Sequence, residues 1–238
     1  MSESESEARL SADVAARLRA VGTASLSTAL RQRGYHDVVV EGVHGLTPGT
    51  RLAGRARTLR LVPFRPDLFA SHGGGFNAQK RAFDSIGAGE VLVVEARGRT
   101  ETGTVGDVLA LRAQIRGAAG LVTDGGVRDA AALADIGLPV FSAGRHPVVL
   151  GRRHVPWETD VVIACGGAAV VPGDVMVGDD DGVLVIPAAL VTEVLADAER
   201  QEREDAWVAR QVAQGQPVRG LFPMDAQWRA RYEQDPDA

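Results

Sequence analysis

The spacing of apolar and polar residues changes several times between Gly103 and Pro139, and each change marks an expected element. Apolar residues recur at helical spacing over Val108–Arg116, whereas Ala118–Val122 is a short uninterrupted apolar run, typical of a buried strand. Gly125-Gly126 is then expected to turn the chain into a second helix that begins near Ala130. This stretch predicts a glycine-rich loop, a helix, a strand, a turn and a second helix.

The same patterns predict further elements before this stretch. A first helix should place Val14, Leu18 and Val21 on one side, with Ser11 or Asp13 as its cap. Other expected elements are a helix over Ser25–Arg33, strands over Val38–Val43 and Gly54–Val62, a helix over Asn77–Ile86 and a buried strand over Val91–Ala96. The glycines Gly73 to Gly75 are interpreted as a flexible loop, with ligand binding as the less favoured alternative.

After Pro139 the pattern predicts mainly strands, and then a long helix. The expected strands are Val140–Ala143, Asp160–Cys165, Val175–Val177 and Val183–Ile186. The last two flank Asp179 to Gly182, where Asp-Gly between apolar runs indicates a hairpin. Its three adjacent aspartates lack the alternation of a calcium loop. From Pro187 to Gly215 the chain is expected to be helical.

Length and composition predict one domain with short additions at both ends. The chain has 238 residues and a mass of 25.0 kDa, which suffices for one substantial core. We expect an acidic, serine-rich, disordered tail over residues 1–10, an α/β domain over 11–215 and a C-terminal arm over 216–238. The arm contains Trp228 and Tyr232 and is expected to pack on its own subunit or on a neighbour.

Charge and cysteine content limit the classes of function. The net charge of −5 and the pI of about 5.6 do not favour a nucleic-acid or membrane partner. The single cysteine, Cys165, allows no internal disulfide and is expected to be a small buried residue. With no signal peptide or membrane-length apolar run in the sequence, a cytoplasmic location is expected.

Three polar residues follow or open the elements of the central stretch. Arg128 and Asp129 come directly after the expected glycine turn, and Asp107 opens the preceding helix. Ligands of α/β proteins gather at the carboxyl ends of strands, so these residues are candidates for a site. Asp107 and Asp129 could instead be helix caps, and Arg128 could pair with an outside carboxylate. The residues alone leave the two interpretations about even.

The site's residue types favour one kind of chemistry. Two carboxylates without a histidine or cysteine partner suit a hard cation, Mg²⁺ or Mn²⁺, that retains several waters. A 2-oxo acid could bind such an ion, which would act as a Lewis acid and stabilise the enolate left by carbon–carbon cleavage. A Schiff-base mechanism is disfavoured because Lys80, the only lysine of the chain, is expected on a half-exposed helix.

Three segments carry a resemblance to a known family. They are GDVLALRAQIRGAAGLVTDGGVRD, IGLPVFSAG and VVPGDVMVGDDDGVLVIP. In motifs, order and spacing they resemble the 4-hydroxy-4-methyl-2-oxoglutarate aldolases, a family that also contains the regulator of ribonuclease activity A. The resemblance runs from about Thr23 to Ala198, and extra residues at Pro63–Phe76 depart from the simpler members. It implies a single-domain, layered α/β/β/α sandwich of the swivelling β/β/α kind.

The resemblance also implies roles for individual residues. Arg128 would contact substrate, and Asp129 would bind the metal directly. The turn of Gly106, Asp107, Val108 and Leu109 would face the ligand with backbone amides, and Asp107 would hold a metal-bound water as a proton carrier.

A further group is implied from the long C-terminal helix. Some aldolase members send a carboxylate from this helix into a neighbouring subunit's metal site, and Glu202 and Asp205 share the helix face that this requires. A trimer or hexamer is therefore expected, although a solvated charged face is the simpler interpretation of these residues. His146 and His154 lack ligand spacing and are expected at the surface or at a subunit contact.

The sequence therefore predicts a metal-dependent lyase that acts on a small 2-oxo acid. Its reaction would be retro-aldol release of pyruvate or decarboxylation of oxaloacetate. Two alternatives stay open. One is a protein-binding regulator of ribonuclease activity, and the other is a metal-dependent dehydratase or decarboxylase of sugar-acid or aromatic breakdown.

Overall fold

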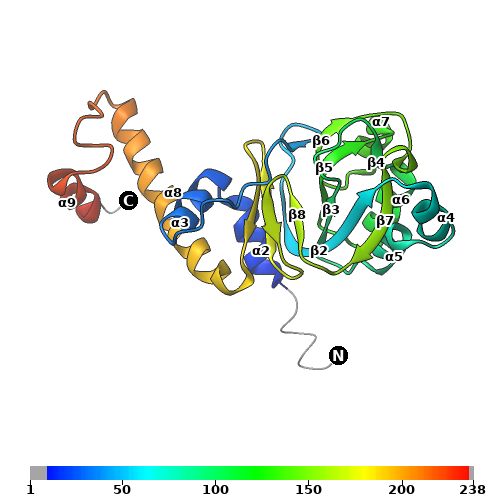
Figure 1. Ribbon diagram of the computed structural model, residues 1–238. Coiled ribbons are helices and arrows are strands. Elements are labelled where there is room, and N and C mark those ends of the chain that lie inside the picture. The colour runs from blue at the N-terminus through cyan, green and yellow to red at the C-terminus, as the bar shows by residue number, and fades with distance from the viewer. Residues whose placement is uncertain (1–9, 236–238) are drawn as a thin grey trace.

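The computed structural model describes residues 10–235 and shows a mixed α/β protein (Figure 1). The strands are β1 (His44–Gly45), β2 (Leu52–Pro63), β3 (Glu90–Glu95), β4 (Gly103–Val105), β5 (Gly120–Val127), β6 (Val140–Arg145), β7 (His154–Thr159), β8 (Ile163–Cys165), β9 (Ala168–Val170), β10 (Val175–Asp179) and β11 (Gly182–Ile186). The helices are α2 (Ala12–Ala20), α3 (Thr23–Arg31), α4 (Pro66–His72), α5 (Ala78–Ser85), α6 (Asp107–Ile115), α7 (Ala130–Ile136), α8 (Val191–Ala213) and α9 (Ala226–Gln234), with 3₁₀ turns η1 (Leu150–Arg152) and η2 (Ala188–Leu190).

Nine of the described strands form one sheet, in the order β1-β6-β5-β3-β2-β10-β11. β4 pairs with β5, and β7 pairs with β2. β2, β3, β5 and β6 run parallel to one another, whereas β10 is antiparallel to both β2 and β11. Parallel strands bring their carboxyl ends to one edge of the sheet. Arg128 and Asp129 come directly after the carboxyl end of β5, at this edge.

The buried apolar side chains of the sheet and its helices form three clusters. One cluster joins the sheet to α5, α6 and α7, and a second joins it to α2, α3 and α8. A third cluster lies inside the curved sheet, beneath β8 and β9. Representative buried residues of the three are Phe83, Leu92 and Leu121; Leu18, Leu26 and Leu195; and Val91, Phe141 and Ile163. The predicted α/β sandwich is confirmed.

Several local predictions are confirmed by hydrogen bonds. Ser11 caps α2, because its Oγ accepts a bond from the Val14 amide at 3.2 Å. The Asp-Gly hairpin is present, with Asp179 opposite Gly182 at the end of the β10–β11 pair. Asp179 is buried, and its carboxylate accepts bonds from the backbone amide and the hydroxyl of Thr23 at 2.9 and 2.7 Å. The aspartates therefore have a structural role here.

Two of the predicted structural elements, one strand and one turn, are wrong. The strand expected over Val38–Val43 is reduced to an isolated bridge between Val39 and Leu184. Gly125 and Gly126 do not turn the chain but continue β5 to Val127. A β-carbon at Gly126 would stand 2.7 Å from the carbonyl oxygens of Thr100 and Thr102. These glycines therefore allow a neighbouring loop to approach the strand, which the turn interpretation missed.

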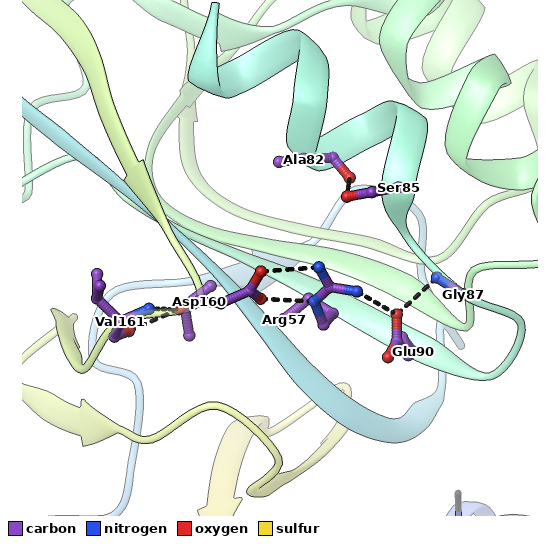
Figure 2. A network of polar contacts seen from close by, with 8 residues as sticks. Arg57, Ala82, Ser85, Gly87, Glu90, Asp160 and Val161 are labelled. Carbon is purple, nitrogen blue, oxygen red and sulfur yellow. Dashed lines mark hydrogen bonds and ion pairs between the residues drawn. The ribbon is translucent and has the colours of Figure 1, made fainter. Parts of the chain in front are cut away.

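An ion-pair network fixes the chain after β7 (Figure 2). The Arg57 guanidinium on β2 donates to both oxygens of Asp160 at 2.6 and 2.8 Å, and it lies 3.3 Å from Glu90 on β3. The bidentate bond to Asp160 raises the pKa of Arg57 above its ordinary value. Asp160 itself has a φ of 58°, in the left-handed region. The network thus ties three parts of the chain together at a sharp bend.

The C-terminal segment packs on α8 of its own chain. Trp207 is buried there, and its ring meets those of Trp228 and Tyr232 at centroid distances of 6.1 and 5.5 Å. This contact agrees with the first of the two positions expected for the arm. The expected N-terminal tail lies outside the described residues except for Leu10, which packs against the core beneath α2. Within residues 10–235, no helix has the length and apolar character needed to cross a membrane.

Candidate active site at the β4–β5 edge

The neighbouring ends of β4 and β5 bring the candidate residues together. The two strands are parallel, with Gly103 opposite Gly126 and Val105 opposite Val127. The Arg128 amide donates to the Val105 carbonyl at 2.9 Å, which extends the pairing by one residue. Because β4 and β5 are paired and parallel, the turns that follow their carboxyl ends begin next to each other. The β4–α6 turn and the β5–α7 turn therefore face each other.

Arg128 and Asp129 form a half-exposed ion pair at this edge. The Arg128 Nε lies 2.9 Å from Asp129 Oδ2, and the two side chains are 36% and 38% exposed. Asp129 occupies the N-cap position of α7, but its side chain makes no cap bond, so the capping interpretation of this residue is wrong. Its φ of 55° and ψ of 40° are left-handed, which costs a non-glycine residue about 1 kcal/mol or more. Such strain is concentrated at functional sites.

Asp107 begins α6, next to Gly106, which lies against this pair. Its Oδ1 accepts a hydrogen bond from the Val108 amide at 2.8 Å, while Gly106 holds the N-cap position. A β-carbon at Gly106 would lie 2.7 Å from Asp129 Oδ2 and 3.2 Å from Arg128 Nε. The turn therefore needs glycine at this position to admit both side chains.

A pocket of about 210 Å³ opens between α6, β4, α5 and η1. The five residues expected to contact substrate all line it: Gly106, Asp107, Val108, Leu109 and Arg128. The sequence interpretation missed the other lining residues, which are Gln79, Gly103, Thr104, Val149 and Leu150. Gln79 could have been recognised from the sequence as a candidate. It is a polar residue on the buried face of α5, where its Nε2 donates to the Thr104 carbonyl at 2.5 Å.

The donor set at this edge suits a hard cation only with water or further ligands. Asp129 and Asp107 offer carboxylate oxygens, which Mg²⁺ and Mn²⁺ prefer. The described part of the chain contains no group of three or more histidine, cysteine, aspartate or glutamate residues placed to hold a metal. Two carboxylates therefore fit an ion that keeps several waters, as Mg²⁺ does.

The C-terminal carboxylates lie away from this pocket within the same chain. Figure 1 places α8 at the end of the molecule opposite α6 and α7. Glu202 accepts bonds from the Gly22 amide at 3.1 Å and from Ser25 Oγ at 2.8 Å, so it caps α3, whose own N-cap is a glycine. Asp205 accepts a bond from Gln201, one turn earlier, at 2.8 Å.

The two histidines differ in environment. His146 Nδ1 accepts a bond from the Val148 amide at 3.1 Å and orders the chain before η1. His154 is fully buried at the start of β7, so the prediction that it lies at the surface is wrong. Burial and the nearby Arg97 guanidinium lower the pKa of His154 to about 4. His154 follows Arg152 and Arg153 in the sequence, and this polar context concealed a core position.

Fold and site together describe a small α/β protein with an arginine and two carboxylates at a sheet edge. Residues 23–185 match the model of the RraA-like family, described as aldolase/RraA, and the chain belongs to that family. A Halalkalibacterium halodurans protein, provisionally named a 4-hydroxy-4-methyl-2-oxoglutarate aldolase, is 31% identical over 160 residues, covering 67% of this chain and 71% of the relative.

Two solved structures extend the similarity to the fold. Streptomyces coelicolor RraAS2, described as an unusual member of the RNase ES inhibitor RraA protein family, aligns with a TM-score of 0.76 and 31% identity. The alignment covers 84% of this chain and 96% of that one. An uncharacterized protein from Pseudomonas syringae aligns with a TM-score of 0.80 and 27% identity, covering 91% and 95% of the two chains.

Proposed function

We propose that this protein is a divalent-metal-dependent carbon–carbon lyase that acts on a small 2-oxo acid. The reaction would be retro-aldol cleavage that releases pyruvate, or the related decarboxylation of oxaloacetate. One observation carries the proposal: two adjacent strand ends bring Arg128 and Asp107 to the lining of one pocket, with Asp129 behind Arg128 as its ion-pair partner. A protein that acted only through surface contacts would have no need of a strained aspartate held against a pocket arginine.

The protein groups have distinct tasks in this reaction. The planar guanidinium of Arg128 would bind substrate oxygens, since its Nε is already oriented by Asp129. The amides of Asp107 and Leu109 lie at the positive end of the nine-residue helix α6 and favour a bound carboxylate, whereas the Val108 amide donates to Asp107 Oδ1. Binding at both places would fix the 2-oxo acid with its reacting bond inside the pocket.

Cleavage requires charge stabilisation and two proton transfers. The electron pair of the broken carbon–carbon bond delocalises onto the keto oxygen, and the departing carbon becomes a carbonyl as its hydroxyl loses a proton. The enolate that is left then takes up a proton at its methylene carbon and becomes pyruvate. Asp107, which lines the pocket, would hold the water that accepts the first proton and returns one to the enolate. Asp129 and Asp107 would hold Mg²⁺ or Mn²⁺, which would supply Lewis-acid polarisation of the keto group.

An oligomer is part of the proposal because α6 has an uncovered apolar face. Val108, Leu111 and Ile115 are 74%, 45% and 69% exposed, whereas Ala110 and Ala113 form the buried face of the helix. A row of large exposed apolar side chains commonly marks a surface that another protein chain covers. Because Val108 also lines the pocket, a subunit packed on this face would border the site. A trimer or hexamer could bring Glu202 or Asp205 of a neighbour there, and Asp205 has fewer bonds within its own subunit to lose.

The proposal is tested by a direct assay. Purified protein is incubated with oxaloacetate and a panel of 4-hydroxy-2-oxo acids, with Mg²⁺, with Mn²⁺, or with a chelator, and pyruvate is measured. Metal-dependent pyruvate release supports the proposal. Activity with sugar-acid substrates alone would point instead to a dehydratase, and no turnover of any substrate with either metal would contradict a lyase.

The second candidate is a protein-binding regulator of ribonuclease activity. The similarity to Streptomyces coelicolor RraAS2, whose family is described as RNase ES inhibitors, favours it. Inhibition of a purified ribonuclease of that class, unchanged in an Arg128→Ala variant without lyase activity, would support this function.

A further inference from the structure

The candidate pocket is lined by both polar and apolar side chains. Arg128, Asp107, Gln79 and Thr104 are the polar ones, and Val108, Leu109, Val149 and Leu150 are the apolar ones; we refer to Val149 and Leu150 of the η1 segment as the apolar wall. Among the described residues that line the pocket, Arg128 is the only cation. Part of its guanidinium is already committed to Asp129 through the Nε bond.

The apolar wall is held by contacts on both of its sides. On the inner side, Thr102 Oγ1 donates to the Val149 carbonyl at 2.7 Å, and the Gly103 amide donates to Val148 at 2.7 Å. On the outer side, the Phe69 ring of α4 lies against Gly151, where an added β-carbon would stand 2.9 Å from the ring. The wall is therefore a fixed surface, and the inserted segment that contains α4 supports it.

A second substrate carboxylate would find no partner at this wall. The Arg128 fork and the α6 amides suit the carboxylate and keto group of a 2-oxo acid. Arg152 and Arg153 follow Leu150 in the chain but do not line the pocket, and Arg153 lies 3.5 Å from Glu101. An ionised group placed against Val149 and Leu150 would lose hydration without a compensating bond, which is costly.

We propose that the pocket selects 2-oxo acids whose distal part is uncharged and compact, with Val149 and Leu150 as the residues that determine this specificity. The inference rests on the retro-aldol form of the proposed lyase function, not on oxaloacetate decarboxylation, and names the substrate class of that reaction. The pocket volume of about 210 Å³ limits the size of the distal group. Dicarboxylates of the same length are the class that the apolar wall rejects.

Two substrates that differ in one distal group provide the kinetic test. 4-Hydroxy-4-methyl-2-oxopentanoate carries a methyl group where 4-hydroxy-4-methyl-2-oxoglutarate carries a carboxylate. The expected kcat/KM is about tenfold or more higher for the monocarboxylate. Leu150→Arg should shift the ratio toward the dicarboxylate, while Leu150→Met, which keeps the wall apolar, should leave the preference in place. A wild-type preference for the dicarboxylate, or a ratio that Leu150→Arg does not move, would overturn the proposal.

A binding measurement separates this inference from the lyase proposal. In Mg²⁺, thermal midpoints are compared with 2-oxo-5-methylhexanoate and with 2-oxoglutarate, which place an isopropyl group or a carboxylate at the same distance from the keto group. The uncharged ligand should give the larger upward shift, and Leu150→Arg should reverse the order. If neither substrate is cleaved but the uncharged ligand still binds better, the lyase proposal is overturned and the specificity proposal is not. Equal shifts, no shifts or a larger shift with 2-oxoglutarate would end the specificity proposal.

Discussion

Gly106 and Asp129 lie in contact across the β4–β5 edge, so closely that a side chain on Gly106 would have to displace the Asp129 carboxylate. A β-carbon built there would be 2.7 Å from Asp129 Oδ2. Because Gly106 has a φ of −125°, its backbone conformation does not require glycine. Glycine is required at this position because the Asp129 carboxylate, which is proposed to bind the metal, occupies the space that a side chain would fill.

Gly106→Ala should therefore damage the site more than the fold. The new methyl group would displace Asp129 and the Arg128 guanidinium, so kcat/KM should fall by about tenfold or more while the thermal midpoint changes little. Gly74→Ala is the matched control, since a β-carbon there meets no atom within 4 Å. Steady-state kinetics of both variants decide the matter, and equal activity in the two would show that the Gly106 contact is not functional.

Asp129→Asn should abolish metal-dependent activity while preserving the fold. Asparagine has nearly the same shape and tolerates the left-handed conformation at this position, but it removes the anionic oxygen. Calorimetric titration with Mn²⁺ should show weakened metal binding, and the thermal midpoint should stay within a few degrees of wild type. Loss of folding with intact metal affinity would assign Asp129 to structure.

Arg128→Lys tests the planar fork. Lysine keeps the positive charge but cannot both bond Asp129 through Nε and present a second pair of donors. We expect kcat/KM to fall by roughly tenfold or more, with KM carrying part of the loss. Arg112→Lys on the same edge of the molecule is a suitable control, because that guanidinium pairs with Asp84 at the surface. Unchanged kinetics in Arg128→Lys would remove Arg128 from the site.

Shared sites would be revealed by mixing two inactive variants. Asp129→Ala protein is combined with Asp205→Ala protein after dissociation, and activity is measured when reassembly is complete. If neighbouring subunits share a site, mixed oligomers contain some interfaces with both residues intact, so activity should return. Asp205 is preferred to Glu202 because Glu202→Ala would also remove the cap of α3. Full activity in a monomer, measured by light scattering, would contradict the arrangement.

His154 should make the protein less stable as the pH falls. Its folded-state pKa of about 4 is lower than the value of about 6.5 expected in the unfolded chain, so the unfolded state takes up the proton first. The free energy of unfolding should decrease between pH 6.5 and 4, by an amount on the order of 3 kcal/mol from this residue. Denaturant titrations of His154→Leu should show a shallower decrease than wild type, whereas the exposed-histidine control His36→Gln should follow wild type.

Sequence patterns were sufficient where one local rule dominated. The helical spacing of α2 and the Ser11 cap depend on neighbours along the chain, and so does the Asp-Gly hairpin after β10. Gly125 and Gly126 were misinterpreted because the reason for a small residue there is a loop that approaches from residues 99–102. No pattern within the strand itself contains that information.

The site shows the same limit. Arg128, Asp129 and Asp107 were candidates because polar residues at helix starts are visible in sequence, and the family resemblance favoured a site over helix caps. The apolar wall was not, since Val149 and Leu150 follow the site by about twenty residues and are held beside it by the Thr102 and Gly103 hydrogen bonds and by Phe69. His154 was misplaced because its arginine neighbours suggested a surface that the β2–β7 pairing covers.

The C-terminal aromatic cluster also gives the protein a built-in optical probe. Trp207 of α8 and Trp228 of α9 meet where the C-terminal arm packs on α8, while Trp157, the third of three tryptophans, stacks on His72 of α4 at a centroid distance of 4.6 Å. Figure 1 places these two regions at opposite ends of the molecule. In Trp157→Phe protein, intrinsic emission therefore reports on the arm alone. A red shift of that emission before the loss of far-ultraviolet ellipticity would show the arm detaching as a separate step.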